Sequence, residues 1–299
     1  MTDPSPIDTR RTLSVPGIGD PTLVLTPTRQ GLYLCNRFDI LGFALIEHGE
    51  WAEPEVAVVT ALLRPGDVVI ECGAHIGTLT IPMARAIAPG GAVHAFEAQP
   101  YFARLLDANL ALNGMADVVM RNVVVSGASG TIRLPPVTYD KSVNYAGLSF
   151  ASLPTDGSGV GKPIPMRTLD QICARFDRLN LIKLDIEDME PAALAGAATL
   201  FDRFRPIVYC KIRRPTAFAQ VRDFLTTRGY RLYWHIFPHY RADNYRGNPV
   251  NRFGVQGDVN LLALPPGKNS ASPGLPPATD FAEVERISPG ILGPATSPR

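Results

Sequence analysis

The feature that most constrains the fold is a short β-branched run at residues 68–70, which ends in Glu71 and leads into a turn from Gly73 to Gly77. Such a run is typical of a parallel strand buried on both faces, and the glycines are typical of a tight turn that opens a helix. Open α/β sheets bind their ligands just beyond the carboxyl ends of such strands. The stretch therefore predicts an α/β fold with a ligand site at this turn.

A second apolar run, residues 92–96, ends in an acid, Glu97. An acid about twenty residues beyond the turn is placed to accept hydrogen bonds from both hydroxyls of a ribose. Dinucleotide cofactors need Gly-x-Gly-x-x-Gly, because the middle glycine lets the backbone approach the pyrophosphate. With Gly73 as the first glycine, the other positions hold His75 and Thr78, so that pattern fails. S-adenosyl-L-methionine has no phosphate, so the stretch favours it over NAD; a turn without any ligand remains the alternative.

Composition narrows the classes of function. With 299 residues, 45% of them hydrophobic and 19% charged, the chain can bury one substantial core, so one main domain with appendages is expected. A net charge of +1 gives no field that would draw nucleic acid or a membrane, and neither is expected as a partner. Cys35, Cys72, Cys173 and Cys210 lack metal-binding spacing and are expected to be free, buried thiols. The first twenty residues contain no apolar leader and no stretch has membrane-spanning length, which favours a cytoplasmic protein.

Periodicity predicts a doubly wound, mostly parallel sheet, because strand and helix patterns alternate from residue 67 onward. Two final strands without a helix between them predict a C-terminal antiparallel hairpin. Strands are predicted at 22–26, 31–35, 68–71, 92–96, 118–125, 131–134, 181–185, 207–212, 230–236 and 259–263. Helices are predicted at 54–63, 78–88, 101–112, 168–176, 191–201 and 217–228.

The domain organisation follows from these patterns. We expect a flexible arm at 1–20, an N-terminal hairpin and cover helix at 21–65, the cofactor-binding domain at 66–264, and a flexible Pro/Gly-rich tail at 265–299. The polar stretch 135–165 is long for a loop in a compact domain and is predicted to be a lid over substrate or cofactor.

Two acids, Asp185 and Glu187, follow the strand predicted beside the cofactor strand. In methyl transfer the sulfonium is the electrophile, so the enzyme must align a nucleophile and manage its proton. A carboxylate at this edge suits either that task or binding of the cofactor's ammonium group. His75 would be kept neutral by the helix N-terminus and would hydrogen-bond the methionine carboxylate or the substrate, or simply fill the turn. His235 and His239 lie among aromatics and would serve as base, line an acceptor pocket or pack.

These arguments give two sets of candidate residues. The predicted catalytic residues are Asp185, Glu187, His75 and His235. The predicted cofactor-binding residues are Glu71, Gly73, Ala74, His75, Gly77, Glu97, Ala98, Asn122, Ser126 and Asp185. No metal is expected, because neither late histidine has companion ligands.

The ordered set of motifs resembles the FkbM-type S-adenosylmethionine-dependent methyltransferases. The matching stretches are Gly66 to Gly77, Phe96 to Pro100, Asn109 with Leu112 to Gly114, Val123 to Ser126, Thr168 to Asp170, Ile182 to Glu187 and Pro206 to Val208. The resemblance covers about residues 50 to 235 in the family's order. It implies a class I methyltransferase (Rossmann-like) fold, contacts of Gly73, Gly77 and Glu97 with the cofactor, and O-methylation of a sugar or natural-product hydroxyl.

The chain departs from this family pattern at a few positions. The family usually has Asp-x-Gly-Ala-Asn where this chain has Glu71 and His75, and Asp-x-Glu-Gly where it has Asp188 in place of glycine. Lys211 stands where the family usually places a glutamate at the end of the next strand. Such a lysine would pair with Asp185 or Glu187, recognise an anionic acceptor, or mark reduced activity.

The sequence therefore predicts an S-adenosylmethionine-dependent methyltransferase that O-methylates a sugar-containing or other small natural-product metabolite. The partner expected is a small-molecule acceptor, and a homo-oligomer is left open. Lys211 and Asp188 motivate the alternative of a binding or scaffold protein that kept the fold. A dehydrogenase is the third reading.

Overall fold

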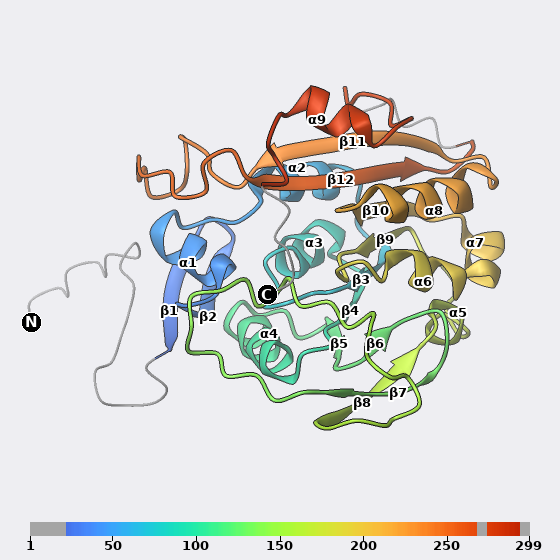
Figure 1. Cartoon of the computed structure of the whole chain (residues 1–299), viewed down its shortest axis with the longest axis horizontal. Coiled ribbons are helices and arrows are strands. Elements are labelled where there is room, and N and C mark those ends of the chain that lie inside the picture. Colours follow the sequence, from blue (N-terminus) through green and yellow to red (C-terminus); the bar gives the residue numbers. More distant parts are fainter. Residues whose placement is uncertain (1–21, 268–273, 294–299) are drawn as a thin grey trace, which may run out of the picture.

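The computed structural model describes residues 22–267 and 274–293, and its centre is a seven-stranded sheet (Figure 1). Neighbouring strands are parallel except at β12, which is antiparallel to the strands on both its sides. The predicted mostly parallel sheet with a C-terminal antiparallel hairpin is thus confirmed. In spatial order the strands are β11 (Arg231–Pro238), β12 (Gly257–Leu264), β10 (Ile207–Lys211), β9 (Leu181–Leu184), β3 (Val68–Cys72), β4 (Ala92–Phe96) and β5 (Val119–Arg121).

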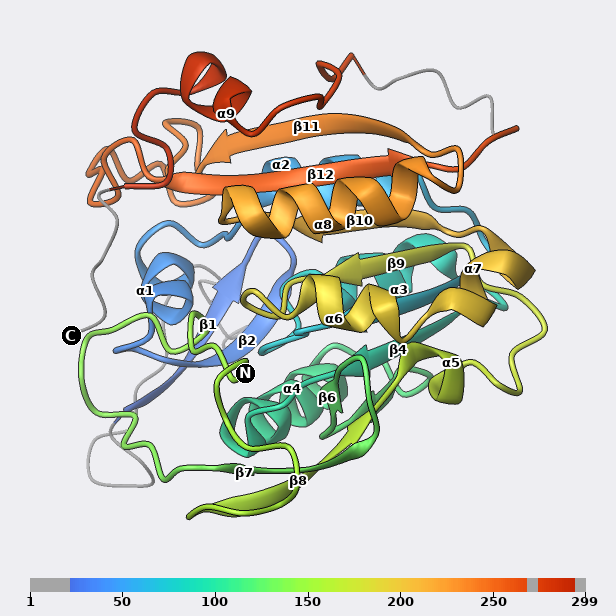
Figure 2. The same cartoon turned by 45° about the vertical axis from the view of Figure 1, so that its right-hand side comes forward.

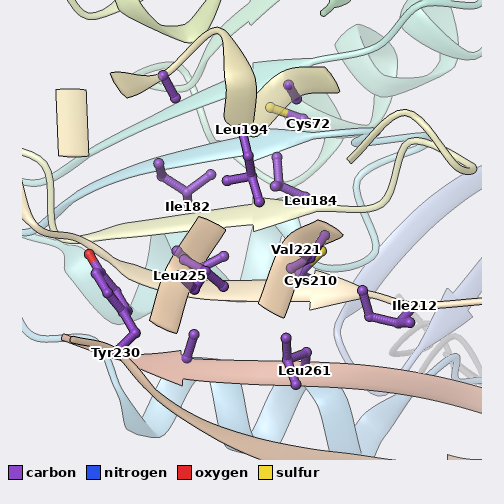
Figure 3. Close-up of a cluster of buried hydrophobic side chains, with 14 of the residues drawn as sticks. Cys72, Ile182, Leu184, Leu194, Cys210, Ile212, Val221, Leu225, Tyr230 and Leu261 are labelled. Carbon is purple, nitrogen blue, oxygen red and sulfur yellow. The ribbon is translucent and has the colours of Figure 1, made fainter. Parts of the chain in front are cut away.

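Helices cover both faces of this sheet (Figures 1 and 2). One face carries α2 (Glu53–Ala61), α3 (Thr80–Ile87) and α4 (Pro100–Leu112), and the other carries α5 (Leu169–Ile172), α6 (Glu190–Ala195), α7 (Ala198–Phe204) and α8 (Pro215–Thr226). The second face holds the larger core, where Ile182, Leu184, Cys210 and Leu261 of the sheet meet Leu194, Val221 and Leu225 of the helices (Figure 3). The strands are continuous apolar runs because this burial occurs on both faces.

An antiparallel hairpin precedes the sheet, as the sequence predicts. It consists of β1 (Leu23–Thr28) and β2 (Gly31–Asn36) and leads into α1 (Ile40–Glu47). Two asparagines of the family-like stretch hold β2 onto α4, because Asn109 Oδ1 accepts from the N–H of Leu34 at 2.7 Å and Asn113 Oδ1 from that of Leu32 at 3.0 Å. The two side-chain amides thus bond the backbone of β2 as a neighbouring strand would.

The strand predicted at 118–125 is wrong as a single element. The chain leaves the large sheet after β5, and β6 (Val124–Val125) instead joins a small sheet with β8 (Lys162–Arg167) and β7 (Gly130–Leu134). Asn122 marks the break, since its side chain donates to the carbonyls of residues 97 and 98, both at 2.8 Å. The predicted polar loop accordingly ends before β8, and we call residues 135–161 the β7–β8 loop.

The predicted flexible tail also needs correction. Residues 1–20 lie outside the described part, but residues 274–293 pack on the molecule and form α9 (Ala282–Ile287). The chain runs along β11, where the N–H of Trp234 donates to Pro276 O at 2.8 Å and that of Ala278 to Leu232 O at 2.9 Å. Buried Val284 and Ile291 outweigh the Pro/Gly-rich composition, which alone suggested disorder.

Candidate active site

A cavity of about 920 Å³ opens at the carboxyl edge of the large sheet. Its size falls within the usual range for small-molecule sites, about 300–1,000 Å³. We call the end formed by the strand ends of β3 and β4 the β3–β4 half, and the end formed by β10, β12 and the chain after β11 the β10–β12 half. Asp185, which follows β9, lies between them and lines the cavity.

The turn after β3 requires glycine at its first position. Gly73 has φ +82°, and a Cβ there would overlap the backbone oxygen of Asp185. His75 and Asp188 also have positive φ, 49° and 72°. These are the positions where the family usually has asparagine and glycine, residues that adopt this conformation readily. His75 and Asp188 thus adopt a left-handed backbone although neither is glycine, and Asp188 makes an ion pair with Arg214 at 3.0 Å.

Glu97 follows β4 and is buried in the wall of the cavity. One carboxylate oxygen accepts from the N–H of His75 and the other from that of Gln99, both at 2.8 Å. Burial raises the pKa of Glu97 to about 7 although these two N–H groups oppose the shift. Each oxygen can accept more than one hydrogen bond, so Glu97 retains capacity for a ligand's hydroxyls.

Three predicted cofactor residues do not line the cavity. Gly77, with φ +92°, packs closely against Leu106, because a Cβ added at Gly77 would lie 2.7 Å from the Leu106 side chain. Asn122 acts from behind by holding the backbone at residues 97 and 98. Ser126 belongs to the small-sheet region, where its N–H donates to Arg167 O at 3.0 Å. Direct contact is therefore corrected to a supporting position for these three residues, which lie behind the cavity wall, whereas Val123, Val124 and Val125 line the cavity.

The remaining predicted cofactor residues line the cavity: Glu71, Gly73, Ala74, His75, Glu97, Ala98 and Asp185. Glu71 is fully buried and accepts a hydrogen bond from the Thr80 hydroxyl at 2.5 Å. Burial raises its pKa to about 7, against the opposing field of Lys183. Glu55 of α2, which the sequence did not single out, lines the cavity nearby, and burial likewise raises its pKa to about 7.

Asp185 is held between two lysines. Its carboxylate lies 3.2 Å from Lys183 Nζ and 3.5 Å from Lys211 Nζ. Burial favours the neutral acid, but the two ammonium groups outweigh it and hold the pKa of Asp185 well below its usual range. Asp185 is therefore ionised at neutral pH and is a weak proton acceptor.

The charge reversal at Lys211 is compensated by the neighbouring strand. Its ammonium lies 3.0 Å from a carboxylate oxygen of Asp258 on β12 and 3.8 Å from Glu187. Glu187 is itself paired with Arg213 at 3.0 Å, and burial raises its pKa despite the nearby Lys211. Because β12 runs antiparallel to β10, its beginning lies at the carboxyl edge and supplies the acid that β10 lacks.

The two late histidines have different surroundings. His235 lies within β11, with Nδ1 2.7 Å from the Tyr209 hydroxyl, and is not among the residues that line the cavity. Burial lowers its pKa to about 4. The predicted catalytic role of His235 is therefore corrected, because its buried ring pairs with Tyr209 and does not line the cavity.

His239 reaches the cavity instead. Its ring stacks on Trp51 with centroids 4.7 Å apart, and Nδ1 lies 3.8 Å from the Asp258 carboxylate. Burial lowers the pKa of His239 although Asp258 opposes the shift, so the ring is neutral at pH 7. Residues 291–293 close the same end of the cavity. Trp51, Asp258 and residues 291–293 lie far apart in the sequence, and only the strand register brings them together. No local sequence pattern therefore predicts that they belong to one site.

The site fits an adenosyl cofactor at the β3–β4 half. The glycine turn gives a close approach that a side chain would block, and Glu97 offers a carboxylate to a ribose. The ring nitrogens of His75 are buried and have no hydrogen-bond partner among the described residues, as expected where a polar ligand completes the site. Within those residues, no group of three or more His, Cys, Asp or Glu side chains is placed to hold a metal ion.

The strand order, the glycine turn after β3 and the acid after β4 are features of the class I S-adenosylmethionine-dependent methyltransferase fold. The model of the methyltransferase FkbM domain matches residues 71–232, more than half of the sequence, and the chain belongs to this family. S-adenosyl-L-methionine is the cofactor of these enzymes. The resemblance noted in the sequence is thus confirmed.

Solved structures with similar folds are distant in sequence. The chain is similar to precorrin-6y C5,15-methyltransferase from Geobacter metallireducens, with 12% identity over 70% of this chain and 85% of that one, and a TM-score of 0.43. It is also similar to an O-methyltransferase from Thermotoga maritima (15% identity, 80% and 76% covered, TM-score 0.42) and to O-methyltransferase TomG from Streptomyces achromogenes (16%, 71% and 79%, TM-score 0.41). No curated protein matches the sequence significantly. No helix in the described residues is long and apolar enough to cross a bilayer.

Proposed function

We propose that the protein transfers a methyl group from S-adenosylmethionine to a hydroxyl of a small sugar-containing or other natural-product metabolite. The observation that carries this proposal is one continuous cavity with two chemically different halves. At the β3–β4 half Glu97 and the glycine turn suit the cofactor, and at the β10–β12 half polar side chains and Trp51 suit a small polar acceptor. The family's usual O-methylation supports the choice of a hydroxyl.

Different residues of the β3–β4 half would bind different parts of the cofactor. Glu97 would accept from the ribose hydroxyls, while Ala98 beside it leaves space for the base. Asp185, held ionised by Lys183 and Lys211, is suited to the ammonium group of the methionine end. His75, with neutral unpartnered nitrogens, would bind the carboxylate of that end by donating an N–H.

The proton of the acceptor hydroxyl needs a base at the β10–β12 half. When bound, the cofactor supplies an electrophilic methyl on its sulfonium. We assign the base to His239, because its ring lines the cavity and makes no hydrogen bond with described residues. His239 takes the hydroxyl proton at a ring nitrogen as the oxygen bonds to the methyl carbon and the carbon–sulfur electron pair stays on sulfur. Asp258 stabilises the resulting imidazolium, and Glu187 remains a second candidate base.

The alternative of a binding or scaffold protein rested on Lys211 and Asp188. Asp258 compensates the charge of Lys211. Asp188 adopts the left-handed backbone of its position and pairs with Arg214. No specific observation therefore favours that alternative.

Calorimetric titration with S-adenosylhomocysteine tests the cofactor half of the proposal. Replacing Glu97 with alanine is expected to raise the Kd roughly 10- to 100-fold, because hydrogen bonds to a buried carboxylate are lost. Asp202→Ala, which removes an exposed acid, is the control and should leave the Kd unchanged. Equal Kd values for Glu97→Ala and wild type would contradict the site.

Mass spectrometry tests the acceptor. The wild-type protein is incubated with S-adenosylmethionine and metabolite extract from the producing cell, and a product heavier by one methylene is expected. Fragmentation that places the methyl on nitrogen or carbon would contradict O-methylation.

A further inference from the structure

A closed chain of contacts, which we call the Glu97 circuit, links the cofactor acid to the β7–β8 loop. Glu97 accepts from the N–H of Gln99 at 2.8 Å, and the side-chain amide of Gln99 donates to the backbone oxygen of Tyr145 at 2.9 Å. The N–H of Tyr145 donates to Asp39 Oδ1 at 3.1 Å. The other oxygen of Asp39 lies 3.7 Å from His75 Nε2, and the N–H of His75 donates back to Glu97 at 2.8 Å.

Every member of the Glu97 circuit is buried. Its hydrogen bonds are therefore shielded from water, and breaking one leaves a buried polar group unpaired. Three of its members, Glu97, Gln99 and His75, line the cavity. A ligand that contacts Glu97 or His75 therefore touches the same network that holds the loop.

Tyr145 is the residue of the β7–β8 loop that belongs to the Glu97 circuit. Its hydroxyl donates to Thr138 O and accepts from the N–H of Lys141, both at 3.0 Å, so the loop also closes on itself. The flanking residues Asn144 and Ala146 line the cavity. In Figures 1 and 2 the green segment after β7 runs past α4 toward α1 before it returns to β8, as this anchoring requires.

The side chain of Gln99 makes hydrogen bonds with two residues of the β7–β8 loop. Besides Tyr145, its side-chain oxygen accepts a hydrogen bond from the Tyr139 hydroxyl at 3.2 Å. The Tyr139 ring stacks on Tyr101 with centroids 4.0 Å apart, which fixes this second point against α4. Gln99 is thus the residue whose backbone binds the cofactor acid and whose side chain binds the loop.

The contact between His75 and Asp39 is the weak member of the circuit. At 3.7 Å it is too long for a hydrogen bond, and both ring nitrogens of His75 lack a partner among the described residues. The loop is therefore held firmly from the Glu97 side and only loosely from the His75 side. Contacts made at Glu97 therefore reach the loop through Gln99, whereas the Val143 N–H to Phe38 O bond at 3.2 Å and the Asn36 Nδ2 to Tyr139 O bond at 2.8 Å hold it independently.

We propose that Gln99 is a positioning residue through which binding of the cofactor ribose at Glu97 fixes the β7–β8 loop over the cofactor. Ribose hydroxyls that donate to Glu97 keep it ionised, and an ionised carboxylate is the stronger acceptor for the Gln99 N–H. A firmly held Gln99 in turn holds Tyr145. Because such coupling is reciprocal, an ordered loop also raises the affinity for the cofactor. The inference rests on the cofactor part of the proposed function and is independent of the acceptor.

Hydrogen–deuterium exchange of the full-length protein, with and without saturating S-adenosylhomocysteine, tests this coupling. In the wild type we expect the ligand to slow exchange of the β7–β8 loop amides at least tenfold. In Gln99→Ala we expect the Kd to rise roughly five- to tenfold through faster dissociation, with loop exchange at saturation remaining near the ligand-free rate. Gln99→Glu, which keeps the size but loses the amide donor, should behave like the alanine variant.

Gln171→Ala is the matched control, because this glutamine caps α5 and does not line the cavity. It should retain the wild-type response. Ligand-free melting curves check that each variant is folded, and the wild-type measurement stands if a variant is not. The proposal is overturned if the ligand binds the wild type without slowing loop exchange, or if saturated Gln99→Ala protects the loop as the wild type does. A wild type that fails to bind S-adenosylhomocysteine at all would remove the cofactor assignment together with the coupling.

Discussion

The two halves of the cavity are built by different means. The β3–β4 half is shaped by backbone, with Gly73 in close approach to the chain after β9 and Glu97 fixed by two N–H groups. The β10–β12 half is shaped by side-chain charges, with acids and bases in contact around Lys211. A backbone cradle admits one shape of ligand, whereas a charge network is adjusted by single substitutions. The difference agrees with the proposed function, in which the first half binds the shared cofactor and the second binds the acceptor.

Gly73→Ala is the most severe way to break the backbone-shaped half. The new Cβ would overlap the Asp185 carbonyl, so calorimetry should detect no binding of S-adenosylhomocysteine. Gly66→Ala is the matched control, because Gly66 has a similar φ of +88° but nothing within 4 Å of the added Cβ. Equal loss of binding in both variants would show that backbone strain, not the close approach, is responsible.

Lys211→Met tests whether the charge-shaped half is a balanced network. It leaves Asp185 and Asp258 without a shared cation, so urea unfolding should show a loss of roughly 3 kcal/mol. Arg222→Met removes an exposed pair with Asp223 and should change stability by less than about 1 kcal/mol. A small effect at Lys211 would mean that water or other groups satisfy the acids.

His239→Gln separates chemistry from binding within the charge-shaped half. Loss of the base should lower the rate of methyl transfer about 100-fold, measured with labelled S-adenosylmethionine and the metabolite extract. The Kd for S-adenosylhomocysteine should stay within about twofold of wild type, since binding belongs to the other half. His94→Gln, which changes a half-buried ring in tilted contact with Phe176, provides the control. An unchanged rate in His239→Gln would move the role to Glu187.

The pH dependence of cofactor binding tests the backbone-shaped half and has the smallest expected effect. Burial raises the pKa of ligand-free Glu97 to about 7, so the carboxylate is protonated below that pH. Ribose hydroxyls favour the ionised form, and affinity should therefore rise with pH through 7. Between about pH 8 and pH 6 the Kd for S-adenosylhomocysteine should increase roughly tenfold. Glu97→Gln should abolish this trend; a trend that persists would assign it to Glu71, whose pKa is raised similarly.

The backbone-shaped half was largely predictable from the sequence. Its turn and its acid come from two adjacent strand-turn units, and local patterns determine such units. Gly73 and Glu97 accordingly line the cavity as expected. Gly77 and Ser126 do not, because no local pattern tells whether a residue near the turn faces the ligand or packs behind it.

The charge-shaped half was not predictable in the same way. Its members meet through the antiparallel register of β12, which single-chain patterns do not specify. The choice between His235 and His239 depended on where β11 ends, and the strand runs two residues beyond the predicted end at 236. His235 lies inside the strand and pairs with Tyr209, whereas His239 is the first residue after it and lines the cavity.

The segment that follows residue 273 has a consequence for self-association. Its backbone pairs with β11 at Leu232 and Trp234, and Trp234 Nε1 donates to Glu283 at 2.9 Å. An outermost strand normally presents free N–H and C=O groups that recruit a strand from another molecule. Here the chain's own end occupies part of that position. Two copies could form one continuous sheet across β11 only after this segment had been displaced from the strand.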